Sequence, residues 1–385
     1  MTQCGNLHLL KYLHLPSLRR PSTTRAVLAA AIILLCGAEV AHSQQPTQQE
    51  ARPKPSQRRL PRGFLGKTIT LSNRAQRKYA VFTPPQYVKD KDHKWPLIIF
   101  LHGSGECGTD GIKQTTVGLP PYVARRAMKF PFIVVMPQAQ NMWFRGQEAA
   151  AVWAILDEVQ STYRVDPDRI YLTGLSMGGI ASWELSVLRP DVFAAIVPVC
   201  GFAPKDYLSN IVDLPTWAFH GALDNNVSVQ GSRDAIEELK RLGGSPIYTE
   251  YPKLQHICWD EAYATPDLWR WLIQQRRKPT PRVIDYVFPA GLSRVWWLAV
   301  EGDKSYKKPC HVHAEIKDGG LIEINSQGVL GWALISDAEP LKPNTPIEVK
   351  WNGQPVFKGE FTGILSIEPQ QTNGTDQKSS TNPAK

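Results

Sequence analysis

The segment Arg-Ile-Tyr-Leu-Thr-Gly-Leu-Ser-Met-Gly-Gly, residues 169–179, contains the strongest fold signal in the chain. Residues 169–173 are β-rich, and residues 178–188 have helical spacing, so the G-x-S-x-G between them places Ser176 in a tight strand-to-helix turn. Glycines 174 and 178 allow neighbouring chain segments to approach closely. Such a turn exposes the hydroxyl at a helix N-terminus, where amides stabilise developing negative charge. We predict that Ser176 is a nucleophile; a turn without catalysis is the alternative.

The alternation of strand and helix continues on both sides of this segment. Strands are predicted at 79–82, 96–101, 131–136, 169–173, 192–197, 214–219 and 246–251, and helices at 149–163, 178–188, 229–242 and 261–275. The runs from 96 to 219 are almost continuously apolar, as is typical of strands covered on both faces. The pattern therefore predicts an α/β fold with a mostly parallel sheet.

The pattern changes after Arg277. Strands alone are predicted, at 282–288, 294–300, 311–316, 321–325, 331–335, 347–351 and 355–361. We therefore predict a small all-β, sandwich-like accessory domain at 281–367, followed by a disordered polar tail at 368–385. Its tryptophans could stack on sugar rings or pack in the core; these are Trp296, Trp297, Trp332 and Trp351. His311 and His313 share a strand face, but no third ligand is evident and no metal is predicted.

The N-terminus has the features of an export signal. Basic residues precede an apolar run at 26–38, which is too short to span a bilayer, and Ala41-His42-Ser43 fits the small-x-small cleavage rule. We predict a signal peptide at 1–43 and a flexible basic linker at 44–62. The mature protein is expected to be secreted or periplasmic, without stable membrane insertion; an uncleaved anchor is the alternative.

The charge distribution and the cysteines limit the class of partner and indicate the compartment. The formal net charge of the 385 residues is +9, but nine basic and no acidic residues lie between positions 51 and 78. The remaining mature chain is slightly acidic, so a nucleic-acid partner is not expected. Export would place Cys107, Cys200, Cys258 and Cys310 in an oxidising compartment. One disulfide among the first three is a hypothesis whose pairing stays open, and buried free thiols are the alternative.

A serine nucleophile needs a base and a group that holds the base. Asp224 follows the strand at 214–219, and His256 follows the strand at 246–251, in the order serine, acid, histidine. His220 opens the turn that carries Asp224 and is interpreted as structural. We predict Asp224 as the acid and His256 as the base.

The developing oxyanion needs two hydrogen-bond donors. One is expected from the amide of Met177, and the other from the loop that begins Leu101-His102-Gly103-Ser104-Gly105, with Ser104 first and Gly105 second. His102 is expected to brace this loop rather than to act as a base. Glu106 follows the loop and either lines the substrate pocket or is solvated.

These segments together resemble a known group. The sequences LHGSGECG at 101–108, RIYLTGLSMGG at 169–179, DVFAAIVPVCG at 191–201, WAFHGALD at 217–224 and HICWD at 256–260 are similar to those of secreted serine esterases of the α/β-hydrolase superfamily, related to the phospholipase/carboxylesterase and polyhydroxybutyrate-depolymerase-like families. The resemblance implies an α/β-hydrolase catalytic domain at 63–277, with Ser176, Asp224 and His256 as the triad and no cofactor. Cys107 stands where a basic residue is expected. Trp143 resembles a pocket-wall aromatic residue, with a core position as the alternative.

The expected activity is hydrolysis of carboxylic esters through an acyl-enzyme. Only 47 residues separate Ser176 from Asp224, which leaves no room for a cap domain. The pocket is therefore expected to be open and to suit polymer-linked or polysaccharide-linked esters. The alternatives are a serine peptidase of the same fold and a polysaccharide-binding role of the C-terminal region.

Overall fold

The computed structural model describes residues 59–143, 146–336 and 338–367. The predicted signal peptide, nearly all of the predicted linker and the predicted tail lie outside these residues. Among the described residues, no helix has the length and apolar character needed to cross a bilayer.

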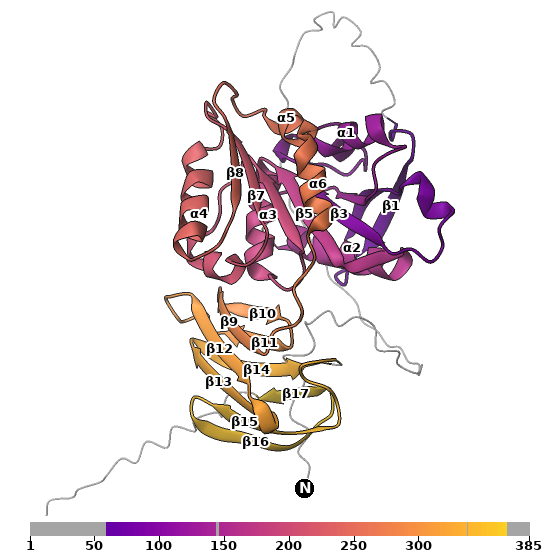
Figure 1. Ribbon diagram of the computed structural model, residues 1–385. Coiled ribbons are helices and arrows are strands. Elements are labelled where there is room, and N and C mark those ends of the chain that lie inside the picture. Colours follow the sequence, from indigo (N-terminus) through magenta and orange to yellow (C-terminus); the bar gives the residue numbers. More distant parts are fainter. Residues whose placement is uncertain (1–58, 144–145, 337, 368–385) are drawn as a thin grey trace, which may run out of the picture. The chain divides into compact units, whose positions relative to one another are not determined.

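An eight-stranded sheet forms the centre of the larger region (Figure 1). Its strands are β1 (Phe64–Thr70), β2 (Gln76–Phe82), β3 (Trp95–Leu101), β4 (Ile133–Pro137), β5 (Val165–Leu175), β6 (Ala195–Val199), β7 (Trp217–Gly221) and β8 (Ile247–Tyr251). The order is β1-β2-β4-β3-β5-β6-β7-β8, antiparallel up to β4 and parallel from there on. Every residue of β3, β4 and β6 is buried, which explains their uninterrupted apolar sequences.

Helices cover both faces of this sheet. They are α1 (Leu119–Arg126), α2 (Gln147–Thr162), α3 (Met177–Leu188), α4 (Val229–Arg241), α5 (Trp259–Ala264) and α6 (Pro266–Gln274). Side chains of α2, α3 and α4 share one buried cluster with one face of the sheet, and those of α1, α5 and α6 share a second cluster with the other face. The chain therefore has the predicted α/β architecture.

One predicted helix is wrong in its extent. Residues 261–275 do not form a single helix, because α5 ends at Ala264 and α6 begins at Pro266. Proline has no amide hydrogen and disfavours helical geometry in the residue before it. Accordingly, Thr265 is extended, with φ −62° and ψ 112°. Pro266 was visible in the sequence and could have predicted this break.

The C-terminal region consists of two β-sheets. Its strands are β9 (Val283–Phe288), β10 (Gly291–Val295), β11 (Leu298–Gly302), β12 (Cys310–Ile316), β13 (Leu321–Gln327), β14 (Val329–Ile335), β15 (Thr345–Trp351), β16 (Gln354–Phe361) and β17 (Ile364–Ile367). The sheet orders are β10-β11-β14-β17 and β16-β15-β13-β12-β9. Side chains from both sheets share one core, as the sandwich-like prediction requires. The domain boundaries stay predictions.

The predicted strand at 294–300 is also wrong, because it is a hairpin. Val295 pairs with Leu298, so Trp296 and Trp297 form a two-residue turn, and Trp296 has a φ of 46°. The apolar tryptophan pair concealed this turn, because such turns normally contain Gly, Asn or Asp. Trp297 is buried and its Nε1 donates to the Pro281 carbonyl at 2.8 Å. Trp332 is buried too, so sugar stacking would fall to the half-buried Trp296 and Trp351.

A buried ion pair ties β2 to α2. Arg77 donates through Nε and a terminal nitrogen to the two carboxylate oxygens of Glu148, at 2.9 and 2.8 Å, and the side chains are only 6% and 3% exposed. Such a pair is costly to break on one side, because the remaining charge stays buried without a partner.

We therefore expect Glu148→Ala to lower the free energy of unfolding by about 3–5 kcal/mol, measured by urea denaturation. The double variant Arg77→Met/Glu148→Met should lose much less, because it leaves no uncompensated charge. Glu238→Ala removes a surface pair with Arg241 and is the matched control, with little change in stability expected because solvent screens exposed charges. Equal losses in Glu148→Ala and Glu238→Ala would contradict the assignment.

Candidate active site

Ser176 occupies a sharp turn between the central strand β5 and helix α3. Its φ of 54° and ψ of −117° are uncommon for a residue with a side chain. Two backbone hydrogen bonds fix this conformation: its N–H donates to the Val199 carbonyl at 2.9 Å, and its carbonyl accepts from Ile180 at 2.9 Å. The first of these bonds ties the turn to the end of β6.

Two glycines make the turn possible. A Cβ atom on Gly178 would lie 1.9 Å from the Leu101 carbonyl oxygen, and one on Gly174 would lie 2.3 Å from the Gly178 carbonyl oxygen. Both distances are far inside any permitted contact, and the obstructing atoms are backbone. The G-x-S-x-G spacing therefore follows from the close packing of the turn against the end of β3.

The structure brings Ser176, His256 and Asp224 together in one hydrogen-bonded chain. His256 Nε2 lies 2.9 Å from Ser176 Oγ, and His256 Nδ1 lies 2.7 Å from Asp224 Oδ2. Asp224 follows β7 and His256 follows β8, so both reach the carboxyl edge of the parallel sheet, where Ser176 also lies. The His256 side chain is 15% exposed and that of Asp224 is fully buried.

The carboxylate of Asp224 is held on both oxygens. Oδ1 accepts the backbone N–H groups of Asn226 and Val227 at 2.8 and 2.9 Å, while Oδ2 faces His256. Burial alone would raise the pKa of Asp224, but the hydrogen bonds from His256, Val227 and Asn226 outweigh burial and lower it. The ionised form is thus favoured.

His220 contacts the same carboxylate oxygen, which the sequence argument missed. Its Nε2 lies 3.1 Å from Asp224 Oδ2 and 3.0 Å from the Val227 carbonyl. Both are acceptors, so Nε2 carries the hydrogen. Nδ1 lies 2.8 Å from Ser232 Oγ, and burial lowers the pKa of His220. The signal available in the sequence was the spacing of His220 and Asp224. This spacing fits a structural turn residue as well as it fits a histidine that contacts the carboxylate.

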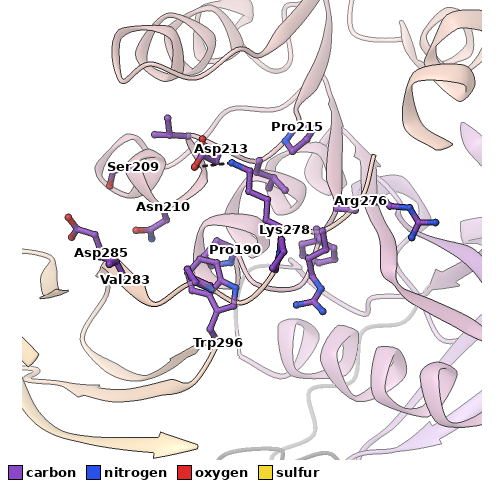
Figure 2. A pocket seen from close by; sticks show the side chains of 17 residues that line it. Pro190, Ser209, Asn210, Asp213, Pro215, Arg276, Lys278, Val283, Asp285 and Trp296 are labelled. Atoms are coloured by element: carbon purple, nitrogen blue, oxygen red, sulfur yellow. Dashed lines mark ion pairs between the residues drawn. The ribbon is translucent and has the colours of Figure 1, made fainter. Parts of the chain in front are cut away.

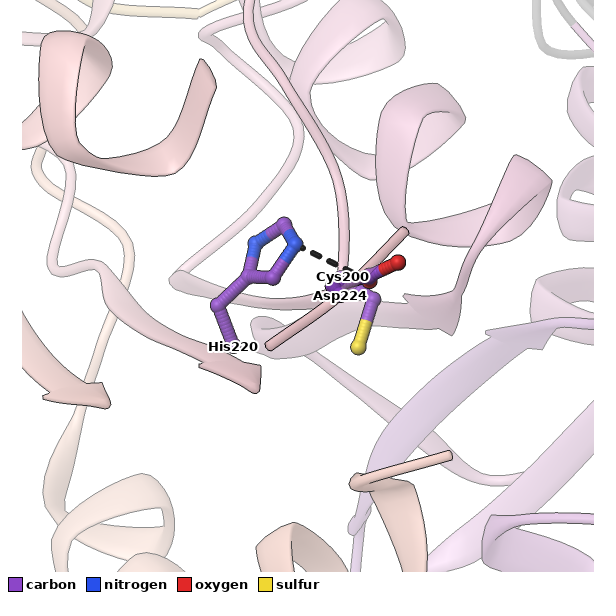
Figure 3. Close-up of side chains that lie close together, drawn as sticks. All are labelled: Cys200, His220 and Asp224. Atoms are coloured by element: carbon purple, nitrogen blue, oxygen red, sulfur yellow. Dashed lines mark hydrogen bonds and ion pairs between the residues drawn. The ribbon is translucent and has the colours of Figure 1, made fainter. Parts of the chain in front are cut away.

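A metal could use three side chains at this point (Figure 3). Ligand atoms of Cys200, His220 and Asp224 lie within 4.8 Å of one another. However, Asp224 Oδ2 already accepts hydrogen bonds from both imidazoles. A bound ion would compete with His256 for the carboxylate, so this cluster does not suit a resident metal. The absence of a metal stays a prediction.

The predicted oxyanion loop follows β3. Ser104 and Gly105 begin the short helix η3 (Ser104–Glu106), and Met177 is the first residue of α3. Amides at such positions have no acceptor within their own helix, so they are free to donate to a ligand. Their role as oxyanion donors is a proposal.

His102 braces this loop, as expected. Its Nε2 accepts the Ala139 N–H at 3.0 Å, so the hydrogen is on Nδ1, which donates to the Gly103 carbonyl at 2.6 Å. Burial lowers the pKa of His102 to about 4, which keeps the ring neutral. Trp143 is fully buried, and its Nε1 donates to the His102 carbonyl at 2.9 Å. This position favours the core alternative, in which Trp143 supports the loop through its hydrogen bond to His102.

Glu106 lies beside the nucleophile. A Cβ atom on Gly103 would be 3.3 Å from Glu106 Oε2 and 3.6 Å from Ser176 Cβ, so the two side chains flank one small gap. Burial raises the pKa of Glu106, against the opposing hydrogen bonds from Gly103 and its own amide. Cys107 is half-buried, and its Sγ lies 3.6 Å from the Asn141 carbonyl.

A cavity of about 250 Å³ lies elsewhere (Figure 2). Its lining includes Asn210, Asp213, Lys278, Asp285 and Trp296, and Lys278 pairs with Asp213 at 3.1 Å. None of the predicted catalytic, oxyanion or pocket residues lines this cavity. The candidate active site is therefore located by the hydrogen-bonded chain around Ser176 and not by this cavity.

Known proteins with a similar sequence or structure support the resemblance to α/β-hydrolases. The chain has the α/β-hydrolase fold, and residues 85–264 match the Phospholipase/Carboxylesterase family, which confirms the resemblance. Poly(3-hydroxyalkanoate) depolymerase C of Paucimonas lemoignei is 35% identical over 121 residues, 28% of each chain. Feruloyl esterase D of Neurospora crassa is 25% identical over 192 residues, 46% of this chain and 64% of the relative. The crystal structure of a thermostable esterase aligns with a TM-score of 0.52 and 31% identity, over 56% of this chain and 63% of that one. The chain spans only 24–28% of the length of the first three curated relatives that it matches.

Proposed function

We propose that this protein is a secreted serine hydrolase that cleaves carboxylic esters through an acyl-enzyme. The observation that carries the proposal is the hydrogen-bonded chain from Ser176 Oγ through His256 to Asp224. The family match and the esterases among the similar proteins support the same chemistry. Secretion rests on the sequence of residues 1–43 alone.

The mechanism follows from these contacts. Ser176 Oγ attacks the ester carbonyl carbon while His256 Nε2 takes the hydroxyl proton, and Asp224 stabilises the imidazolium. The C–O bond to the alcohol breaks, and His256 returns the proton to the leaving oxygen. Water then attacks the acyl-enzyme with the same proton transfers and releases the acid. The amides of Met177 and of Ser104 or Gly105 would stabilise the oxyanion in both steps.

Polymer-linked esters are the proposed substrates. The 47 residues between Ser176 and Asp224 form α3, β6, the helix η5 (Lys205–Ile211) and β7, so no cap is built from them. Leu223 and Ile257, the neighbours of Asp224 and His256, are large apolar side chains that are 52% and 64% exposed. A site with no cap in the described segment between Ser176 and Asp224, and with exposed apolar neighbours, suits bulky ester chains, as the names of the depolymerase and feruloyl esterase relatives also suggest.

The test compares matched ester and anilide substrates with the same acyl group. We expect ester hydrolysis with a burst of alcohol and negligible anilide cleavage, because an amine leaves less easily than an alcohol and needs a better-placed proton donor. Anilide hydrolysis at a rate similar to that of the ester would instead favour the peptidase alternative. No turnover of either substrate would overturn the proposed function.

Glu106 should make the site discriminate against anionic acyl groups. A negative charge on Glu106, close to the nucleophile, should lower kcat/KM for an anionic relative to a neutral ester roughly 5- to 20-fold. Since the pKa of Glu106 is raised, this discrimination should increase as pH rises through that raised value. In Glu106→Gln the ratio should be higher, and it should be independent of pH above the range in which the carboxyl group of the anionic ester itself ionises.

The measurement uses a monosuccinate and a butyrate ester of one chromogenic alcohol. Asp110→Asn, which alters a carboxylate in the same loop, is the control. A pH-dependent ratio that persists in Glu106→Gln would assign the discrimination to another group.

A further inference from the structure

Two buried thiols lie behind His256. Cys200 follows β6, and Cys258 is the residue before α5. Both are fully buried, and their Sγ atoms are 3.0 Å apart. Non-bonded carbon atoms pack at roughly 3.5–4.0 Å, and sulfur is larger than carbon, so 3.0 Å is a short distance for two sulfur atoms. The fold therefore holds the two sulfur atoms in direct contact.

The pair connects the two segments that place the nucleophile and the base. Cys200 follows Val199, whose carbonyl accepts the Ser176 N–H. Its Sγ donates to the His256 carbonyl at 3.1 Å, and Cys258 N–H donates to the same carbonyl at 3.0 Å. The sulfur pair is thus directly attached to the loop that carries His256.

The backbone of Cys200 is held in an uncommon conformation. Its φ is 51°, a left-handed value that a residue with a side chain rarely adopts, and its N–H donates to the Phe219 carbonyl at 2.9 Å. Such conformations persist only where surrounding contacts enforce them, and they cluster at functional sites. Here this conformation brings the sulfur to Cys258.

We propose that Cys200 and Cys258 are joined by a disulfide bond that fixes the His256 loop against the end of β6. The disulfide itself does not depend on the proposed function. Only the role of the loop, which is to hold the base His256, rests on that function. The chemistry needs an oxidant, which is a small-molecule disulfide such as oxidised glutathione. One cysteine thiolate attacks that disulfide, and the second displaces glutathione from the mixed disulfide; two cysteine protons pass to two glutathione thiolates.

The surroundings determine when the bond can form. The hydrogen bond with Cys200, followed by burial, raises the pKa of Cys258. Because the thiolate is the reactive species, exchange in the folded protein should be slow. The disulfide should therefore form while the chain folds, and it should then resist reductants because both sulfur atoms are buried.

The test is peptide mapping of the full chain after refolding with and without oxidised glutathione, with alkylation under denaturing conditions. After oxidation we expect a cross-linked peptide that contains Cys200 and Cys258 and is about 2 Da lighter than its reduced parts. Cys107 should remain alkylatable. Alkylation of both Cys200 and Cys258 after oxidation, or a cross-link of either to another cysteine, would overturn the proposal.

Variants test what the bond does. The oxidised wild type should melt roughly 5–10 °C above its reduced form, because the cross-link closes a long loop. Cys258→Ser should show no such difference, whereas Cys107→Ser should keep both the cross-link and the difference. Equal melting temperatures of the oxidised and reduced wild type would overturn the stabilising role. The cross-link without esterase activity would contradict the proposed function alone.

Discussion

Replacing Ser176 with alanine is expected to lower kcat on an activated ester on the order of 10⁴-fold or more. The variant lacks the oxygen that lies 2.9 Å from His256 Nε2, so no acyl-enzyme can form. Binding and the oxyanion amides remain, which is why some rate above that in water should persist. The fold should survive, because alanine keeps the Cβ atom and the backbone bonds to Val199 and Ile180.

The measurement combines steady-state kinetics with intact mass after treatment with a fluorophosphonate. The wild type should gain one covalent adduct, and Ser176→Ala should gain none. Ser161→Ala is the matched control, because its hydroxyl donates only to the Glu158 carbonyl at the exposed end of α2; it should keep both activity and adduct. An adduct on the Ser176→Ala protein would move the nucleophile to another residue.

The candidate triad was predictable because each member follows a local signal. Ser176, Asp224 and His256 each come directly after or close behind a β-rich run, and the ends of parallel strands meet at one edge of a sheet. Chain order then left few candidates among the histidines. The hydrogen-bond lengths depend on packing, which a linear pattern does not contain.

Other features were missed because their local signals point elsewhere. β1 has mostly exposed side chains, so its sequence FLGKTIT lacks a strong apolar pattern. In α1, Pro120 and Pro121 suggest a break, yet prolines fit the first turn of a helix, where the amides have no partner. The contacts of His220 with Asp224 and of Cys200 with Cys258 are tertiary, and only the folded chain reveals them.

Asp224→Asn is expected to lower kcat roughly 10³–10⁴-fold, less than Ser176→Ala, in a protein that still folds. The asparagine oxygen can still accept from Asn226 and Val227, which places its amide nitrogen where Oδ2 was. That nitrogen donates hydrogen and cannot accept the Nδ1–H of His256. His256 then favours the tautomer with hydrogen on Nε2. This nitrogen faces Ser176 Oγ and, because it already carries a hydrogen, it cannot accept the hydroxyl proton.

The contact of His220 with Asp224 should make the loss of activity in Asp224→Asn larger than the triad contacts alone predict. The carboxylate oxygen Oδ2 accepts from two imidazoles, so an amide there meets two donors instead of one. Asp234→Asn, at a surface carboxylate paired with Lys205, is the matched control and should leave kcat unchanged. The readout is kcat on the butyrate ester together with the melting temperature of each variant. If Asp224→Asn kept most of the wild-type kcat in a folded protein, the carboxylate would not set the tautomer of His256, and the base would need another partner.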